Sequence, residues 1–152
     1  SLTSELSPPV LHEFGLVAAI EWIAGKMSAE SPIQFRCSDD GEVKPMGEEL
    51  STLLFHAVRE LLVNAIKHSK AKNVQITIER ESSTIRITVA DDGIGSQWES
   101  VSPRSIRTGG FGLFNIRERL HHFGGEMNIS VVQGGGTKIV LTSPLSVKSI
   151  RN

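Results

Sequence analysis

Arg59-Glu60-Leu61-Leu62-Val63-Asn64-Ala65-Ile66-Lys67-His68-Ser69 is the stretch of sequence that decides the fold. It closes the strongest helical pattern in the chain, which predicts a helix from Glu48 to about Ser69. Hydrophobic residues at helical spacing form one apolar stripe: Leu50, Leu54, Ala57, Val58, Leu61 and Ala65. A polar row adjoins the stripe, with members spaced four, four and three apart: His56, Glu60, Asn64 and Lys67. The helix therefore carries a buried face and a row of polar groups side by side.

Alternating strands follow this helix. Hydrophobic and polar residues alternate over residues 74–79 and again over 85–89, with Ser82 and Ser83 as the turn between them. Further strands are predicted over Met127–Val131 and from Lys138 to Leu141, separated by a turn at Gly134–Gly136. Each paired strand has one dry and one wet face, which favours an antiparallel sheet covered by helices on one side only.

Another helix is predicted before the long one. Pro8 and Pro9 are tolerated at its first turn, and hydrophobic residues recur at helical spacing over Val10–Lys26. Pro32 ends this pattern, Ile33–Cys37 is a candidate short strand, and residues 38–47 are polar and loop-like.

A glycine cluster opens the last helix. Gly109, Gly110 and Gly112 follow a loop over residues 96–108 and lead into an apolar seam made of Leu113, Ile116, Leu120 and Phe123. Gly124 and Gly125 supply a left-handed stop. A helix N-terminus attracts phosphate through its unpaired N–H groups, and glycines let the backbone approach an anion. The alternative for this cluster taken alone is a flexible turn before a helix.

Asn64 is a candidate metal ligand. Its amide oxygen is a hard ligand suited to Mg²⁺, which takes one or two protein ligands together with phosphates and waters. Glu60 lies one turn earlier, where it could orient a water of the metal shell or act as a base, and Lys67 lies about one turn later, where it could meet phosphate charge. The alternative is a solvated polar face beside a core stripe.

The sequence Asp91-Asp92-Gly93-Ile94-Gly95 ends the second strand. Asp91 can accept a hydrogen bond from an exocyclic amine such as that of adenine, and Gly93 and Gly95 would let a base lie close to the backbone. Thr137, after three glycines, could reach the same pocket from the last strand. The alternatives are a routine turn and an ordinary strand threonine.

Composition argues against several classes of protein. The 152 residues fit one globular domain, and a net charge of -1 argues against a nucleic-acid binder. The single cysteine, Cys37, fits a reducing compartment and is interpreted as a small buried apolar residue. No apolar run reaches the length of a membrane span, and zinc-ligand spacing is lacking. We expect an excised, soluble fragment from the cytoplasmic part of a longer protein, whose membrane attachment stays open.

The three clusters together carry a family resemblance. Arg59–Ser69 resembles the N box of the superfamily of gyrase, heat-shock chaperones, histidine kinases and mismatch-repair ATPases. Asp91–Gly95 is similar to its first glycine box, and Gly110–Leu113 to its second. Asn-Ala-Ile-Lys-His-Ser combined with Gly-Leu-Phe-Asn-Ile-Arg-Glu-Arg-Leu looks most like sensor histidine kinases of the nitrate-sensor and lipid-fluidity-sensor type. The stretch Leu6–Leu16 resembles the second helix of that group's dimerisation hairpin.

This resemblance implies a fold and a division of the chain. The fold would be an α+β two-layer sandwich of the Bergerat type, with a mixed, mostly antiparallel sheet and helices on one face. Residues 1–30 would be the remnant of a dimerisation helix and a linker. Residues 31–145 would form the ATP-binding catalytic domain, and 146–152 a tail.

The resemblance also implies roles for single residues. Asn64 would bind Mg²⁺, Glu60 and Lys67 would join it in catalysis, and Lys67 and His68 would face the phosphates or ribose. Asp91 would read the adenine amine beside Gly93 and Gly95, with Thr137 supporting Asp91 through a water. The remaining ATP contacts would come from the lid at Gly109, Gly110, Phe111, Gly112 and Leu113. The lid departs from the family's longer phenylalanine-bearing form, and Trp98, Arg104 and Arg107 are its candidate contacts.

A histidine kinase would need an acceptor histidine, which the resemblance puts on a helix ahead of the Pro-Pro segment. His12 lies after the prolines, so we do not expect it to be phosphorylated. The fragment would bind Mg²⁺–ATP, and its partners would be the phospho-acceptor domain of a homodimeric parent and a response regulator. Two alternatives stay open: a serine kinase of the anti-sigma type, and a non-catalytic nucleotide-binding module.

Overall fold

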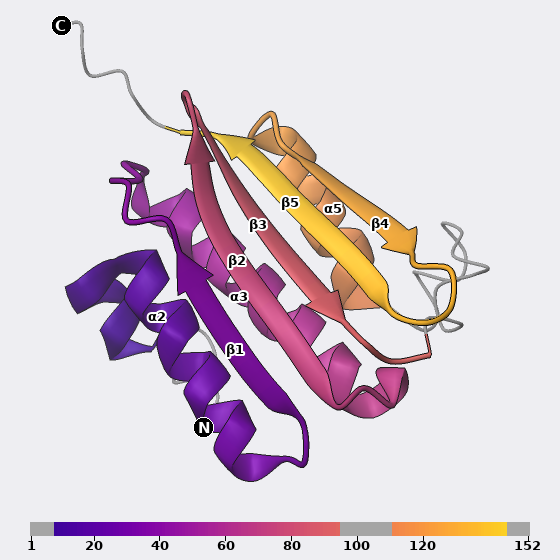
Figure 1. Ribbon diagram of the computed structural model, residues 1–152. Coiled ribbons are helices and arrows are strands. Elements are labelled where there is room, and N and C mark those ends of the chain that lie inside the picture. Colours follow the sequence, from indigo (N-terminus) through magenta and orange to yellow (C-terminus); the bar gives the residue numbers. More distant parts are fainter. Residues whose placement is uncertain (1–7, 95–110, 146–152) are drawn as a thin grey trace, which may run out of the picture.

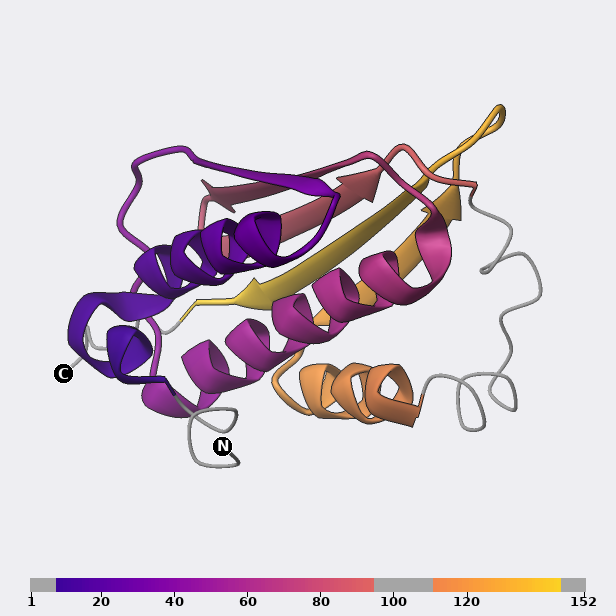
Figure 2. The same cartoon turned by 90° about the horizontal axis from the view of Figure 1, so that it is seen from below.

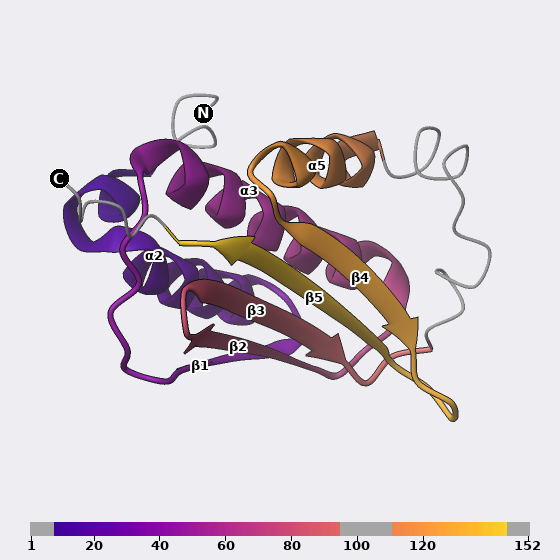
Figure 3. The ribbon, with the colours of Figure 1, turned by 90° about the horizontal axis from the view of Figure 1, so that it is seen from above.

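The computed structural model describes residues 8–94 and 111–145, which form a layer of helices on one face of a five-stranded sheet (Figure 1). The elements in chain order are α2 (Pro9–Glu30), β1 (Gln34–Asp39), α3 (Glu48–Asn64), the π-helix η1 (Ala65–Ser69), β2 (Asn73–Glu81), β3 (Thr84–Asp91), α5 (Phe111–His122), β4 (Glu126–Val131) and β5 (Thr137–Pro144). Helices α2, α3 and α5 all lie on the same side of the sheet, and the other face carries no helix in the described part of the chain (Figures 2 and 3). The predicted α+β sandwich is confirmed.

The sheet is mixed and mostly antiparallel, as predicted. Its strand order is β1-β2-β3-β5-β4, and only the β1–β2 pair is parallel among the described strands. Short turns join β2 to β3 and β4 to β5, since antiparallel neighbours need no crossover. The parallel pair is connected through α3, which crosses the sheet on its covered face (Figure 2).

The core lies between the sheet and its helices. Alternate residues of β2, β3 and β5 point to the helical side and are fully or almost fully buried: Val74, Ile76, Ile78, Ile85, Ile87, Val89, Ile139 and Leu141. Leu54 and Leu62 of α3 meet this layer with no exposed surface. Burying a side chain of this size contributes about 1.5–3 kcal/mol relative to leaving it exposed, so the period-two rows stabilise the sandwich.

The first helix is longer than predicted and is bent. Gly15 has φ 92° and ψ 179°, a backbone conformation that side chains disfavour, and it divides α2 into a short first segment and a long second one. The expected single helix over Val10–Lys26 is therefore corrected to a kinked one that ends at Glu30. Leu16, Ile20 and Ile23 are buried in the same core as the residues of the sheet, so α2 packs against the segment that follows residue 30. The origin of residues 1–30 as the remnant of a dimerisation helix stays a prediction.

The second predicted helix does not continue unchanged to Ser69. α-helical structure ends at Asn64, and one π-helical turn follows over Ala65–Ser69. Lys70, which comes next, adopts the left-handed conformation with φ 57°. The seryl Oγ of Ser69 donates to the Ala65 carbonyl oxygen at 2.8 Å, in a buried position at the end of this turn. Single π turns of this kind are frequent at functional sites.

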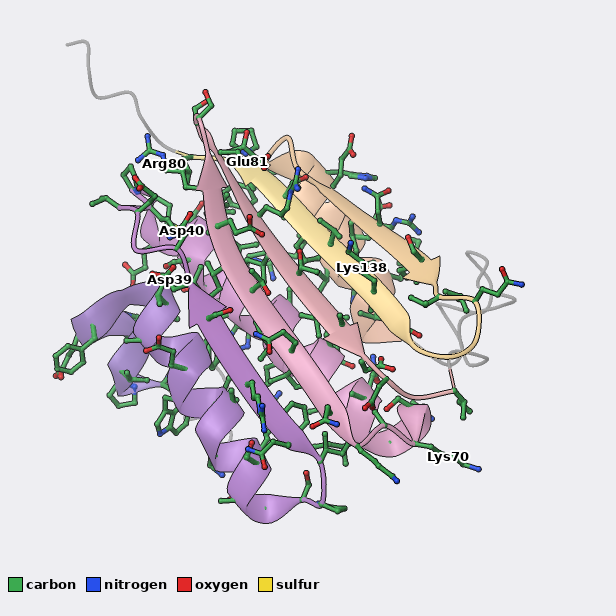
Figure 4. All side chains as sticks on the ribbon, viewed as in Figure 1. Asp39, Asp40, Lys70, Arg80, Glu81 and Lys138 are labelled. Atoms are coloured by element: carbon green, nitrogen blue, oxygen red, sulfur yellow. The ribbon has the colours of Figure 1, made fainter. Side chains whose placement is uncertain are left out.

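A cluster of charged side chains lies at the other end of the sheet from η1, where β1 ends beside the end of β2 (Figure 4). The Lys44 ammonium, whose side chain is almost fully buried, donates to Asp39 at 2.7 Å and also to Asp40. The second Asp40 oxygen accepts the backbone N–H of Arg80 at 2.7 Å. These bonds hold the connection after β1 against the end of β2.

Cys37 is half-buried on β1 rather than fully buried as expected. Burial, with smaller contributions from Glu21 and Asp39, raises the pKa of its thiol to about 11. The thiol is therefore protonated at neutral pH, which agrees with its interpretation as an unreactive residue.

Candidate functional site

One end of the sandwich gathers the polar residues that the sequence singled out. Asn64 ends α3, Asp91 ends β3 and Thr137 begins β5. Asp91 and Thr137 are directly paired partners in the β3–β5 ladder. η1 lies at this same end, and α5 starts there on the helical side (Figures 1 and 2). The structure therefore brings Asp91 and Thr137 together, at the end of the sandwich where α3 gives way to η1.

Asp91 continues the buried row of β3. The side chains of Ile85, Ile87 and Val89 point to the helical face, so strand alternation sends Asp91 to the same face at the edge of the core. Its carboxylate accepts the backbone N–H of Gly93 at 2.8 Å. Burial raises the pKa of this carboxyl, and hydrogen bonds from the Gly93 and Thr137 backbones counteract part of that effect. The half-buried carboxylate retains acceptor capacity for an amine.

Thr137 places an unpaired hydroxyl beside Asp91. The residue is 1% exposed, and its Oγ1 has no hydrogen-bond partner among the described residues. A buried hydroxyl without a partner costs about 1–3 kcal/mol, so this position suits a water or a polar ligand group that completes it. The observation fits the predicted role of Thr137 in supporting Asp91 through a water.

Two glycines permit close approaches of backbone around Asp91. A Cβ on Gly136 would lie 2.5 Å from the Asp91 carbonyl oxygen. A Cβ on Gly93 would lie 2.1 Å from the Ser69 carbonyl oxygen. Neither contact leaves room for a side chain, so Gly93 is required for packing against η1 as well as for the predicted approach of a base.

Asp92 is a supporting residue that sequence reasoning missed. Its carboxylate accepts the backbone N–H groups of Lys72 at 2.8 Å and Asn73 at 3.0 Å, and also the Asn73 side-chain amide. The Asn73 hydrogen bonds contribute most to lowering its pKa. The alternation of β3 could have predicted this role, because it sends the side chain of Asp92 to the side of the sheet opposite to Asp91.

Glu60 and the start of α5 are in direct contact. A Cβ on Gly112 would lie 3.0 Å from Cδ and 3.1 Å from Oε2 of Glu60. Glu60 and Asn64 are both half-buried and one turn apart on α3. The first turn of α5 therefore lies against Glu60 on the polar row of α3, with Asn64 one turn further along that row.

Comparisons with known proteins agree with this arrangement. The profile of the HATPase_c family, described as histidine kinase-, DNA gyrase B- and HSP90-like ATPases, matches residues 49–147. The chain belongs to this family. An uncharacterised sensor-like histidine kinase from Chloroflexus aurantiacus is 31% identical over 93% of this chain and 24% of its own length. The nitrate/nitrite sensor NarX of Escherichia coli K12 is 33% identical over 87% of this chain and 21% of its own length.

A solved histidine kinase domain shares the fold. The domain from the blue-light-activated histidine kinase of Erythrobacter litoralis EL346 is 27% identical, with a TM-score of 0.71, over 86% of this chain and 61% of that one. The predicted ATP-binding domain of the sensor histidine kinase type is confirmed. This HATPase_c domain spans about a quarter of the length of the curated relatives it matches.

The metal-binding prediction for this ATPase domain rests on an amide. Within residues 8–94 and 111–145, no group of three or more His, Cys, Asp or Glu side chains could hold a metal ion. A site with one protein oxygen from Asn64 and the remaining ligands from phosphates and water fits Mg²⁺, which keeps most of its waters. Glu60, one turn away, would supply a carboxylate for such a water.

The other predicted residues fall into three groups. Lys67 and His68 lie exposed on η1, between Asn64 and Ser69. Leu113 is 1% exposed and belongs to the core, so its side chain packs α5 rather than standing free for a ligand. The predictions for Gly95, Gly109, Gly110 and the Phe111 side chain lie outside the described residues, together with the lid candidates Trp98, Arg104 and Arg107.

Across the two described ranges, no helix combines the length and the hydrophobicity that a bilayer crossing requires.

Proposed function

We propose that this domain binds Mg²⁺–ATP and presents the γ-phosphate to a histidine on a dimerisation helix of a longer parent protein. The observation that supports this most strongly is the pairing of Asp91 with Thr137 at the end that also holds Asn64. A carboxylate acceptor, an unpaired hydroxyl and an amide oxygen then lie at one end of one core. The carboxylate would suit the adenine base, the hydroxyl a bridging water, and the amide oxygen a metal ion on the triphosphate.

Asp91 would recognise the adenine base of the nucleotide. Its carboxylate would accept a hydrogen bond from the adenine amine, while the Thr137 hydroxyl would hold a water between the two groups. Gly93 and Gly136 let the backbones of η1 and β5 pack closely around Asp91. A site that hydrogen-bonds an amine in a partly buried pocket discriminates strongly against a base without one, because its polar groups are then left unpaired.

The phosphate end would be built from α3, η1 and the start of α5. Asn64 would hold Mg²⁺ through its amide oxygen, and the ion would neutralise phosphate charge. Glu60 would orient a metal-bound water, and Lys67 and His68 would face the phosphates. The unpaired N–H groups at the N-terminus of α5 would add partial positive charge.

Phosphoryl transfer would need little covalent chemistry from this domain. Positioning and charge neutralisation carry most of such a reaction. The attacking imidazole is neutral in a good fraction of molecules at pH 7, so a strong base is unnecessary. We therefore assign Glu60, Asn64 and Lys67 to alignment and electrostatics.

The parent protein would be a homodimeric sensor kinase that passes its phosphoryl group to a response regulator. Residues 1–30 would derive from its dimerisation helix and linker, 31–145 would form the catalytic domain, and 146–152 a tail. The domain would lie on the cytoplasmic side of a parent that a membrane segment could anchor. No nucleic-acid partner is proposed, since the net charge is -1.

The test uses the present chain and the parent protein. The chain should bind ATP more tightly with Mg²⁺ than without it in a calorimetric titration, and Asp91→Asn should abolish most of that binding. With γ-labelled ATP, the parent should incorporate a label that resists base and is lost in acid, as phosphohistidine is. The chain alone should stay unlabelled.

Two outcomes would redirect the assignment. An acid-stable label on a partner protein would indicate a serine kinase of the anti-sigma type. Failure of the wild-type chain to bind any adenine nucleotide would indicate a non-catalytic module.

A further inference from the structure

Ser69 is a fully buried polar residue at the end of the π turn. Its Oγ donates to the Ala65 carbonyl oxygen at 2.8 Å and accepts the Ala71 N–H at 3.0 Å. One hydroxyl therefore closes the turn on both sides, in a place that solvent does not reach. Without it, the Ala65 carbonyl oxygen and the Ala71 N–H would each lose the hydrogen bond that the Ser69 hydroxyl provides.

The main chain of the same residue contacts the turn after β3. The Ile94 N–H donates to the Ser69 carbonyl oxygen at 2.8 Å. Gly93 packs so tightly on Ser69 that an added Cβ would lie 2.1 Å from that oxygen. Since the Gly93 N–H also donates to the Asp91 carboxylate at 2.8 Å, a short series of contacts joins η1 to Asp91.

We propose that Ser69 is a positioning residue that fixes the separation between the phosphate end and the base end of the nucleotide site. The inference rests on the proposed function, in which Asn64 meets the metal-bound phosphates and Asp91 meets the base. Ser69 connects the turn that starts after Asn64 to the turn that starts after Asp91. Being fully buried, it contacts no nucleotide itself.

A second connection does not replace this one. Asp92 bonds to the backbone N–H groups of Lys72 and Asn73, so it fastens the end of β3 to the start of β2. Neither partner belongs to η1. The position of Lys67 and His68 relative to Asp91 therefore depends on the π turn that Ser69 closes, while Asn64, the last residue of α3, is also held by the packing of that helix on the sheet.

The experiment compares a ligand that spans both ends with one that reaches only the base end. Mg²⁺–ATP and adenosine are titrated against wild type, Ser69→Ala and Ser143→Ala. Ser143 is a matched control because it is about equally buried, and among the described residues its hydroxyl donates to the Pro144 carbonyl oxygen at the far end of β5. We expect Ser69→Ala to raise the Kd for Mg²⁺–ATP about fivefold, the size of one net hydrogen bond, and the Kd for adenosine by less than about twofold. Ser143→Ala should change neither.

Other outcomes would overturn the role of Ser69. An equal loss for both ligands would make it a support of the base pocket alone, and a lowered Tm with unchanged affinities would make it purely structural. Ser69→Cys keeps the size of the side chain with weaker hydrogen bonds, so it carries the same test if Ser69→Ala does not fold, and an ATP-to-adenosine ratio equal to that of wild type would contradict the proposal. Absence of ATP binding by wild type is a separate result, because it removes the proposed function itself.

Discussion

The first turn of α5 lies directly on the side chain of Glu60: a Cβ added to Gly112 would stand 3.0 Å from the Glu60 carboxyl carbon. This contact joins the start of a helix to the polar row of α3 across a large distance in sequence. It gives Gly112 a packing reason to be glycine, in addition to any movement of a lid. Because residue 112 has no side chain, the Glu60 carboxylate can lie against the backbone of α5.

Gly112→Ala should separate stability from nucleotide binding. The added methyl displaces the Glu60 carboxylate, which lies at the end of a flexible side chain, while alanine gains about 0.8–1 kcal/mol of helix propensity over glycine. The free energy of unfolding should therefore stay within about 1 kcal/mol of wild type. The Kd for Mg²⁺–ATP should rise about fivefold, measured by calorimetry.

Gly25→Ala is the matched control for this substitution. Gly25 lies on α2, and a Cβ there would meet no described atom within 4 Å beyond the neighbouring backbone of its own helix. Denaturant unfolding should show a gain of about 0.4–1 kcal/mol with unchanged ATP affinity. Equal ATP affinity in both variants would mean that the Gly112–Glu60 contact does not matter for the nucleotide.

Asp91→Asn should mainly weaken nucleotide binding, whereas Asp92→Asn should mainly lower stability. The first removes the anionic acceptor for an amine, and hydrogen bonds to charged groups contribute about 1.5–3 kcal/mol, so the Kd for ATP should rise about tenfold or more. The second weakens the bonds to Lys72 and Asn73 and should lower the free energy of unfolding by about 1 kcal/mol, with a smaller change in affinity. Calorimetric titration and urea unfolding of both variants give the comparison.

The reverse result would exchange the two roles. If Asp92→Asn lost nucleotide binding while Asp91→Asn mainly lost stability, Asp92 would be the residue that faces the base.

Thr137→Val should stabilise the free protein while it weakens nucleotide binding. Its buried hydroxyl has no partner among the described residues, so an apolar replacement of the same shape removes an unsatisfied group. We expect Tm without nucleotide to stay level or rise by a few degrees. The Kd for ATP should rise about fivefold, because a water between Asp91 and the base loses its third partner. Scanning calorimetry with and without ATP measures both.

Thr137→Ser is the control, since it keeps the hydroxyl. It should retain wild-type ATP affinity despite the lost methyl group. A Thr137→Val variant that loses stability and keeps full affinity would show that the hydroxyl serves the fold alone.

Asp40 should make the protein sensitive to acid. The hydrogen bond from Lys44, together with the Arg80 and Glu42 N–H groups, lowers the pKa of this carboxyl from 3.8 to about 2. A pKa below the unfolded value gives stability that is complete above pH 3.8 and is lost as pH falls toward 2. Urea unfolding from pH 6 to pH 2 should show that loss in wild type and a smaller one in Asp40→Asn. Parallel curves for the two proteins would exclude Asp40 as the cause.

Local sequence pattern was sufficient for the layers and for much of the site. Alternation over residues 85–89 fixes which side chains face the helices, and continuing it by one step sends Asp91 inward. Helical spacing on α3 likewise sets Glu60 and Asn64 one turn apart on one face. These features follow from backbone periodicity, which the order of hydrophobic and polar residues records directly.

The sequence alone determined the two-layer architecture, the residues of its core and the polar groups available to a nucleotide. The tertiary structure decided which of those groups meet: Gly93 against Ser69, Asp92 against Asn73, Gly112 against Glu60, and the π turn after Asn64. The physical reason is that periodicity is a property of one segment. Each of these contacts instead depends on strand order and register, and therefore on several segments packing at once.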